Sequence, residues 1–389
     1  MHHVERENEL LMRVGILGAA LMASGTAMPV SAASSEAPVR QAFDMSFPYV
    51  PSFVLVGNDK LIAYELHLTN FASSPLTLIQ IRVGHDISGA KLLQLNGETL
   101  ASALGHVGPG PYDKLVVPPG RRVVIYLETP VGDHPVPKTL QHCVEYTVAQ
   151  PGSTARGSVE GSVIVDTRPL PILSPPLRGK HWTAVYDPKL ERGHRRVVYA
   201  VGGKARIPGR FAIDWMANGQ SGNGLGADVL AVADGVVASV RDGVPQPVAG
   251  SPRPEVGIAD ATGNYISIDI GGGRFAFYEH LMPGLLIKPG QRVRRGQVIG
   301  RVGSTGQAWR PHLHFHLADA DSPLAAEGLP YLLEGAQIEG AYPSIAAFEV
   351  GGPWQSAAAP SSKAAFPAPN VVVSFDCKDE PYNERKPSC

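Results

Sequence analysis

The amino-acid sequence predicts an all-β protein with two domains. Proline and glycine clusters fall at short intervals between β-rich runs, a pattern typical of strands joined by turns, and the 389 residues include 43 glycines and 35 prolines. Long amphipathic helical repeats are absent from the sequence. Because a chain of this length can bury two cores, we expect an immunoglobulin-like β-sandwich at residues 42–166 and a second β domain at residues 178–376.

The charge balance argues against one class of partner. The formal net charge is −1 at pH 7, and only 18% of the residues are charged. Binding to nucleic acid through bulk electrostatics needs a clear excess of basic residues. We therefore expect no nucleic-acid partner, and the sequence does not indicate an oligomeric state.

The first 32 residues have the features of an export signal. Arg13 precedes the apolar run at residues 14–23, and residues 30–32 (VSA) resemble a cleavage site. The run is too short to cross a membrane comfortably. We expect a signal peptide at residues 1–32, no transmembrane span in the mature chain, and a secreted or periplasmic protein. An uncleaved anchor is the alternative, and translation could begin at Met1 or Met12.

The three cysteines of the chain are compatible with an exported protein, in which disulfides can form. Cys377 and Cys389 could close a small loop, which would leave Cys143 unpaired. No CxxC spacing occurs, so we expect no cysteine-based metal site. Residues 371–376 (VVVSFD) predict a last strand that folds back on the second domain, and residues 377–389 predict a polar tail.

The first domain shows alternating strands but no group of catalytic residues. Strands are expected at residues 61–70, 76–83 and 122–127, with turn signals between them. Its scattered histidines have the pattern of ordinary strand or surface residues: His67, His85, His106, His134 and His142. We interpret the domain as a spacer, or as a module that shields or presents a site. Four prolines within residues 169–176 predict an extended linker at 167–177.

The second domain begins with two β-like runs, residues 193–201 and 204–215, which meet at Gly202-Gly203 as in a hairpin. Asp214 lies among apolar residues in the second run, a poor place for a carboxylate without a partner. More strands are expected at 226–237, 263–270 and 275–281. Glycines 303 and 306 predict a loop whose backbone closely approaches another segment.

Three histidines alternate along residues 311–317 (PHLHFHL). Side chains in a strand point alternately to opposite faces, so His312, His314 and His316 share one face and the apolar residues between them share the other. Protonated imidazoles so close together would repel each other. The spacing is better explained if at least one of them binds a metal ion.

The order of these motifs resembles that of the M23 family of zinc metallopeptidases, the lysostaphin-like cell-wall endopeptidases. The resemblance covers roughly residues 190–320 and rests on Asp214, the run at 226–237, Tyr278-x-His280-Leu281, the turn at 293–300 and His312-x-His314. It implies a largely antiparallel β domain with a groove. It also implies that Asp214 and His314 bind one Zn²⁺ per chain, and that His280 and His312 handle the proton and the polarised carbonyl.

One position departs from the family pattern. Four residues before Asp214 the family has a histidine ligand, and here the residue is Arg210, which cannot be deprotonated and cannot bind zinc. His194 is the candidate third ligand. A two-residue loop at Gly202-Gly203 would put His194 on the wrong face, and a three-residue loop would put it on the face of Asp214. The sequence leaves both registers open.

The resemblance implies a secreted zinc-dependent endopeptidase that cuts peptide bonds, above all those of peptidoglycan. Arg210 could then bind a substrate carboxylate or offset the charge of Asp214, and we assign Arg210, Tyr278 and His316 to the substrate-binding groove. The alternative is a degenerate M23-like domain that binds cell-wall peptide or regulates another hydrolase without cutting. Arg210 favours that alternative, whereas the presence of Asp214, His280, His312 and His314 opposes it.

Overall fold

A computed structural model describes residues 41–375, apart from 86–88, 151, 218–223, 249, 251–254 and 358–363. The predicted signal peptide, the predicted tail and the pair Cys377 and Cys389 lie outside the described residues. The regular structure of the described residues is mostly β-strand, which confirms the all-β prediction. No helix in this part of the chain has the length and apolar character needed to cross a membrane.

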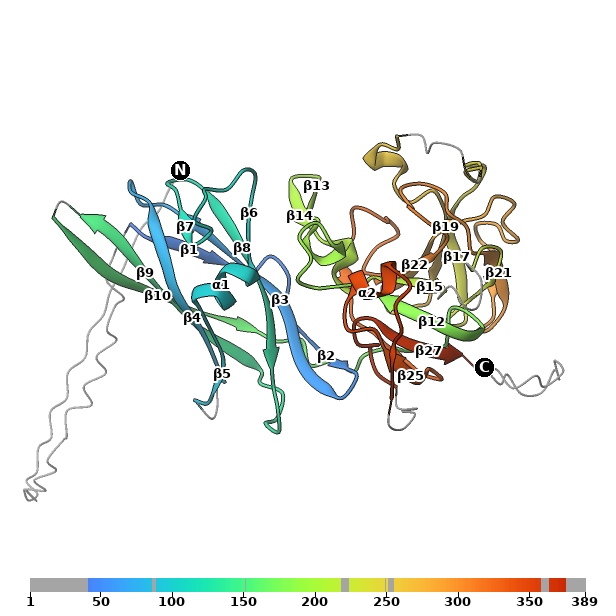
Figure 1. Ribbon diagram of the computed structural model, residues 1–389, viewed down its shortest axis with the longest axis horizontal. Helices are drawn as coiled ribbons and strands as arrows, with labels where there is room; N and C mark the ends of the chain where they lie inside the picture. The colour runs from blue at the N-terminus through green and yellow to red at the C-terminus, as the bar shows by residue number, and fades with distance from the viewer. Residues whose placement is uncertain are drawn as a thin grey trace, which may run out of the picture. The chain divides into compact units, whose positions relative to one another are not determined.

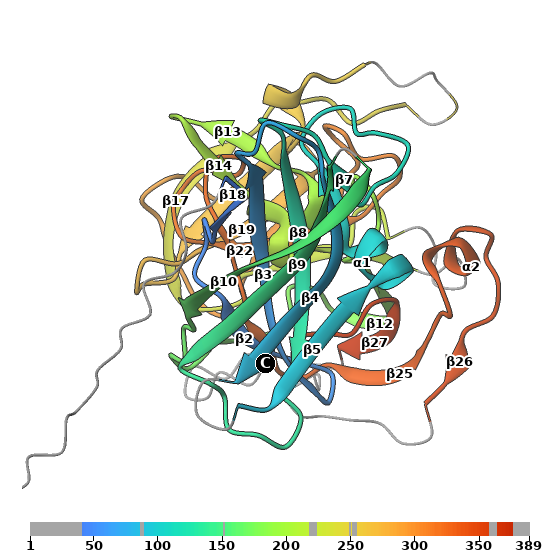
Figure 2. The ribbon, with the colours of Figure 1, turned by 90° about the vertical axis from the view of Figure 1, so that its left-hand side faces the viewer.

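The first domain is a sandwich of two five-stranded sheets (Figure 1). One sheet has the order β1-β3-β8-β6, with β2 also paired to β3: β1 (Phe43–Ser46), β2 (Ser52–Val56), β3 (Asp59–Asn70), β6 (Leu104–His106) and β8 (Arg122–Pro130). The other has the order β10-β9-β4-β5, with β7 on β4 (Figure 2): β4 (Leu76–His85), β5 (Lys91–Asn96), β7 (Val116–Val117), β9 (Thr139–Gln150) and β10 (Ser153–Ile164). Helix α1 (Gly97–Ala103) joins β5 to β6.

Strand β3 is buried on both of its faces. One face, with Ile62, Tyr64, Leu66 and Leu68, packs into the core between the two sheets. Successive side chains alternate, so Glu65 points the other way, and yet it is only 2% exposed. The far face of β3 is therefore also covered by protein, and this burial of a carboxylate bears on the site described below.

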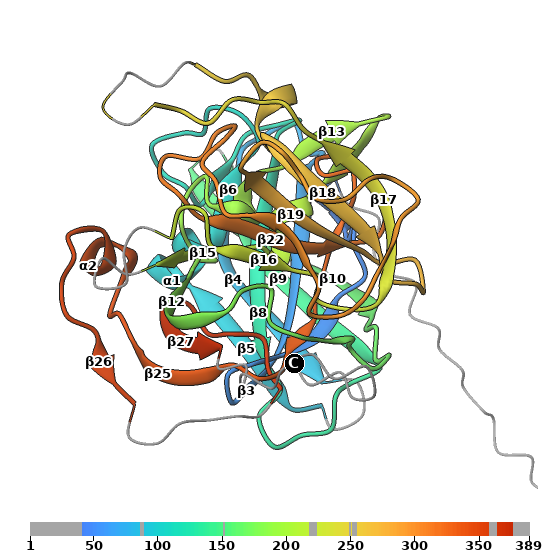
Figure 3. The ribbon, with the colours of Figure 1, turned by 90° about the vertical axis from the view of Figure 1, so that its right-hand side faces the viewer.

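The second domain is built on an 11-stranded sheet with the order β20-β17-β18-β19-β22-β15-β12-β27-β25-β26, and β23 pairs with β22 (Figure 3). All of these pairs are antiparallel. The strands are β12 (Gly179–Val185), β15 (Ile213–Ala217), β17 (Gly235–Arg241), β18 (Asn264–Asp269), β19 (Phe275–Leu281), β20 (Arg292–Val293), β22 (Leu313–Ala318), β23 (Gly328–Leu329), β25 (Gln337–Ala341), β26 (Gln355–Ser356) and β27 (Val371–Phe375).

Smaller elements surround this sheet. Three two-stranded sheets pair β11 (Ile172–Leu173) with β24 (Leu332–Leu333), β13 (Tyr199–Val201) with β14 (Lys204–Arg206), and β16 (Asp228–Leu230) with β21 (Val298–Arg301). In the described part of this domain the short helices are η1 (His194–Arg196), η2 (Pro208–Phe211), η4 (Ile258–Asp260) and α2 (Ile345–Glu349).

Two segments tie the ends of the second domain together. The proline-rich stretch contains β11, and its residues Leu173 and Leu177 belong to the domain's core cluster. Residues 173–177 of the stretch are therefore buried in the fold, whereas residues 167–169 and Ile172 are exposed. At the other end, β27 pairs with both β12 and β25, as expected for a last strand that folds back.

Candidate metal centre and active site

Three adjacent strands align two carboxylates with one histidine. In the register of the sheet, His314 of β22 lies opposite Asp214 of β15 on one side and opposite Glu279 of β19 on the other. Residues directly opposite each other point to the same face. Nδ1 of His314 accordingly lies 2.9 Å from Oδ1 of Asp214. This row across the sheet is the base of the candidate site.

His194 reaches the row from outside the sheet. It begins helix η1, its Nε2 lies 3.2 Å from Oδ2 of Asp214, and its ring centroid is 4.7 Å from that of His314. Potential ligand atoms of His194, Asp214 and His314 all lie within 4.8 Å of one another. The structure thus brings together the three side chains that were predicted as ligands.

The route by which His194 arrives differs from the one expected. Residues 194–196 form a helix and not a strand, so the predicted strand at 193–201 is wrong over that part. The hairpin β13–β14 pairs Val201 with Lys204 across a two-residue loop, so the three-residue register is also wrong. His194 precedes β13 and lies outside the paired part of the hairpin, so the length of the loop does not determine where its side chain points. Helix η1 orients its side chain instead.

Arg210 is not one of the grouped ligand side chains, and its guanidinium is buried. Its side chain is 2% exposed, with Nε 2.8 Å from Oε2 of Glu65 and Nη1 2.9 Å from Oε2 of Glu327. The guanidinium also lies over the ring of Tyr49, 4.0 Å from the centroid. The assignment of Arg210 to substrate binding is therefore not supported, because two buried carboxylates already hold its charged group.

His280 and His312 stand beside the row with a defined tautomer. Nδ1 of His280 lies 2.9 Å from the carbonyl oxygen of Thr305, and Nδ1 of His312 lies 2.8 Å from that of Arg310. A carbonyl oxygen only accepts, so each Nδ1 carries the proton and each Nε2 keeps its lone pair when the ring is neutral. Nε2 of His312 lies 3.5 Å from Oδ1 of Asp214.

Burial and neighbouring charges together determine the pKa values of the site residues. Burial alone would raise the pKa of Asp214, but the charges of His194 and His312 and hydrogen bonds from His194 and His314 hold that pKa well below its usual value. Burial also lowers the pKa of His314, and it lowers that of His280 far below the ordinary value, helped by the charges of His312 and His314. The site therefore presents an ionised Asp214 with neutral imidazoles at His280 and His314. At His194, burial is outweighed by the charge of Asp214 and by hydrogen bonds, which raise the pKa of the imidazole.

These residues fit a zinc ion. Neutral imidazole nitrogens and a carboxylate oxygen are zinc ligands, and catalytic zinc sites use three protein ligands. Asp214 has the nitrogens of three histidines within 3.5 Å of its two oxygens, a concentration of ligand atoms around a single charge. Glu279, His314 and His316 also offer ligand atoms within 4.8 Å, but Glu279 and His316 are buried. The set with His194 is the more accessible one.

Tyr278 and His316 do not line a groove. Tyr278 is fully buried in the core cluster, and its hydroxyl accepts a hydrogen bond from the backbone of Val232. His316 is 1% exposed and its ring stacks on Phe277 at a centroid distance of 4.9 Å. The structure does not support assigning either residue to substrate binding, because neither side chain is exposed to a substrate.

Glu279 is a site residue that the sequence analysis missed. Burial, together with the charge of Asp214, raises its pKa well above the ordinary value. Its Oε1 lies 3.7 Å from Nδ1 of His316, whose own pKa is well below normal because of burial. We interpret the contact as one between neutral groups beside His314 on the same face of the sheet. A carboxylate within the apolar run of β19 was the available signal.

The predicted close approach of the glycine loop is present. A Cβ on Gly303 would lie 2.5 Å from backbone atoms of Leu281 and Met282, and one on Gly306 would lie 2.3 Å from the carbonyl oxygen of Ala261. Only glycine fits at these contacts. The loop thereby packs against the end of β19, where its Thr305 carbonyl accepts the hydrogen bond from His280.

The sequence of this region matches a known family. Residues 218–326, which include His280, His312 and His314, match the profile of Peptidase family M23. The chain carries an M23 peptidase domain. The resemblance inferred from the motifs is therefore confirmed. Asp214, Arg210 and His194 precede the matched span.

Named relatives share parts of this M23 domain. Peptidoglycan DD-endopeptidase ShyA of Vibrio cholerae is 36% identical over 102 residues, which are 26% of this chain and 20% of that protein. Peptidoglycan DD-endopeptidase ShyC of the same organism is 43% identical over 53 residues, 14% of this chain and 12% of that protein. The match thus spans a fifth or less of these relatives. The catalytic domain of lysostaphin from Staphylococcus simulans is 21% identical, with 39% of this chain and 88% of that one covered and a TM-score of 0.23.

Proposed function

We propose that this chain is an exported, zinc-dependent endopeptidase that hydrolyses peptide bonds, with peptidoglycan cross-links as its substrate. The observation that carries the proposal is the group of His194, Asp214 and His314, whose potential ligand atoms lie within 4.8 Å of one another. The relatives named as peptidoglycan DD-endopeptidases support the substrate class. Zinc bound there would polarise the scissile carbonyl and lower the pKa of a bound water.

The residues of the chain divide the remaining work between them. His312 is a better general base than His280, because its Nε2 carries a lone pair that can accept a proton. That Nε2 lies 3.5 Å from Oδ1 of Asp214, whose charge would stabilise the imidazolium. The protonated His312 could then donate to the leaving amine. His280 stays neutral because burial lowers its pKa far below normal. It can therefore accept a hydrogen bond from the attacking water, but cannot easily donate one to the developing oxyanion.

The test is metal analysis of the purified full chain together with digestion of purified peptidoglycan. The wild type should hold one zinc and release cross-link fragments. His312→Ala should keep the zinc and lose cleavage, because it removes the base and not a ligand. A wild type that holds zinc but never cuts would favour the degenerate domain suggested by Arg210, and a wild type without zinc would refute the proposal.

A further inference from the structure

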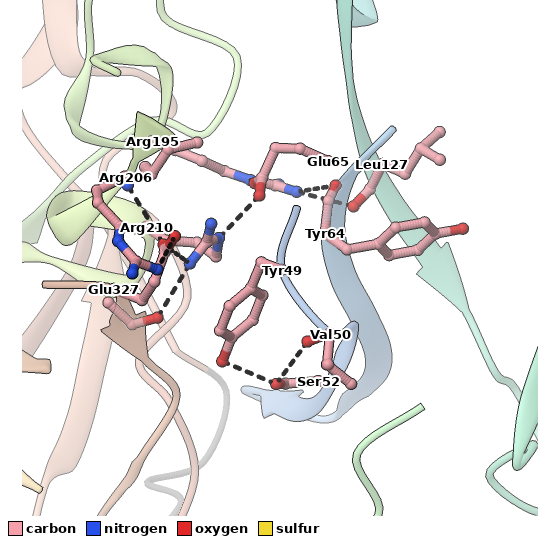
Figure 4. A network of polar contacts seen from close by, with 12 residues as sticks. Tyr49, Val50, Ser52, Tyr64, Glu65, Leu127, Arg195, Arg206, Arg210 and Glu327 are labelled. Carbon is pink, nitrogen blue, oxygen red and sulfur yellow. Dashed lines mark hydrogen bonds and ion pairs between the residues drawn. The ribbon is translucent and has the colours of Figure 1, made fainter. Parts of the chain in front are cut away.

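Arg195, the residue after His194, is bonded entirely to the sandwich domain. Its guanidinium donates to Oε1 of Glu65 (3.2 Å) and Oε1 of Glu128 (3.1 Å), and to the backbone carbonyls of Tyr64 (3.1 Å) and Leu127 (2.8 Å). All four acceptors belong to β3 and β8, and Figure 4 shows Arg195 reaching toward these strands. The helix that carries His194 is therefore fastened to the other domain.

The same carboxylate also holds helix η2. Oε2 of Glu65 accepts from Nε of Arg210 at 2.8 Å, so the two oxygens of Glu65 bind one arginine from each helix. The helices touch through their backbones, because a Cβ on Gly209 of η2 would lie 2.9 Å from the carbonyl oxygen of His194. Glu65 thus clamps η1 and η2 together.

Within the second domain, η1 is held by its packing against η2 and by a hydrogen bond from Nε of Arg196 to the carbonyl oxygen of Pro188 (3.2 Å). Helices of this type are weak when so short, and η1 has three residues and pairs with no strand. The imidazole of His194 contacts Asp214 and the backbone of Ala212, contacts that depend on where η1 lies. Arg195 is 5% exposed and holds η1 by charge-assisted bonds, the stronger kind.

We propose that Glu65 is a positioning residue of the metal centre: acting through Arg195, the β-sandwich holds His194 beside Asp214 and His314. This inference rests on the proposed zinc site and gives the first domain a role in it. Arg210, which stands where the family has a ligand, is the second arm of the same clamp. The chain thereby replaces a ligand on one segment by a ligand whose place depends on a separate domain.

The test compares metal affinity in the full-length chain and three variants. Glu65→Gln removes the charge that both arginines share. Glu128→Gln removes one contact of Arg195 at a side chain that is 34% exposed, so it should fold even if Glu65→Gln does not. Arg206→Gln is the matched control, because the ion pair of Arg206 in the same cluster is with Glu327 and not with a residue of η1 or of the sandwich strands. Zinc affinity is measured by chelator competition, and the coordination geometry by cobalt(II) absorption.

Glu65→Gln should lower zinc affinity about tenfold or more, the usual cost of losing a group that orients a metal ligand, and should change the cobalt(II) spectrum. Glu128→Gln should shift both in the same direction by less, and Arg206→Gln should bind as the wild type does. The inference would be overturned if Glu65→Gln and Glu128→Gln both bound zinc with the affinity of the wild type. If Glu65→Gln does not fold, an unchanged zinc affinity in Glu128→Gln would overturn it. If the wild type itself binds no zinc, the proposed function fails instead.

Discussion

Two regions contribute to the candidate metal centre, and they hold their residues in different ways. Asp214 and His314 face each other across the β15–β22 pair, where backbone hydrogen bonds set the register. His194 stands on a three-residue helix that is fastened by Arg195 to Glu65, 130 positions away in the sequence. The sheet positions its residues locally, whereas the helix depends on ion pairs with another domain. A single site can thus combine a rigid half with a half that responds to charge.

The most severe test of this comparison removes one ligand from each half. His314→Ala and His194→Ala should each lower zinc affinity by more than about 100-fold, since losing a ligand costs more than losing an outer partner, which costs 10–100-fold. Chelator competition measures both, with His106→Ala as the control because His106 bonds only a nearby backbone carbonyl. Loss of affinity in His314→Ala alone would mean that the helical half is not part of the centre.

The second test breaks the clamp itself. Arg210→Ala leaves Glu65 and Glu327 without a shared buried partner, so the free energy of unfolding should fall by about 3–5 kcal/mol. Urea denaturation measures the change. Arg82→Ala removes an exposed pair with Glu145, which contributes little to stability, and should lower the free energy of unfolding much less. Equal free energies of unfolding for the two variants would show that the buried cluster contributes little to stability.

The smallest effect concerns pH. Burial alone would raise the pKa of Glu65, but the charges of Arg210 and Arg195 together hold that pKa below the usual 4.5. A carboxylate with a lowered pKa contributes stability that is complete above pH 4.5 and is lost as the pH falls below that value. Asp214 in β15 also has a lowered pKa, but the hydrogen bonds that set the register of β15 and β22 join backbone groups, which do not titrate.

Hydrogen exchange, corrected for intrinsic rates, should detect this difference between pH 6 and pH 4. Protection of the amides of Arg196 and Arg210, which bond within the two short helices, should fall more than protection in β22. In Glu65→Gln the extra loss should disappear. A uniform loss over both regions in the wild type would contradict separate modes of anchorage.

Periodicity in the sequence predicted the sheet half well. Alternation along residues 311–317 places His314 on the face of Asp214, and the apolar residues between the histidines are buried as expected. Alternation reports only the face, however. It could not tell that Tyr278 and His316 are covered, because that depends on which segments pack over the strand.

The helical half was predicted for a reason that proved wrong. His194 was named because a ligand was missing at Arg210, and a strand register was invoked to bring it close. The structure places its imidazole next to Asp214 through helix η1, and zinc binding by His194 remains a prediction. Partners such as Glu65 and Arg195 share no spacing or motif in the sequence, so no local pattern could reveal them.

The place of β27 in the sheet has a consequence for synthesis of the chain. β12 opens the large sheet, but its neighbour β27, whose Phe375 packs edge-on against Trp215, comes after almost all of that domain in the sequence. Domains generally fold in order from the N-terminus during translation, and the sandwich has all its strands by Ile164. Until β27 has been synthesised, the edge of β12 that pairs with it stays unpaired. An unpaired strand edge can bind another chain and so promote aggregation. We therefore expect a chain that lacks β27 to expose this edge of β12.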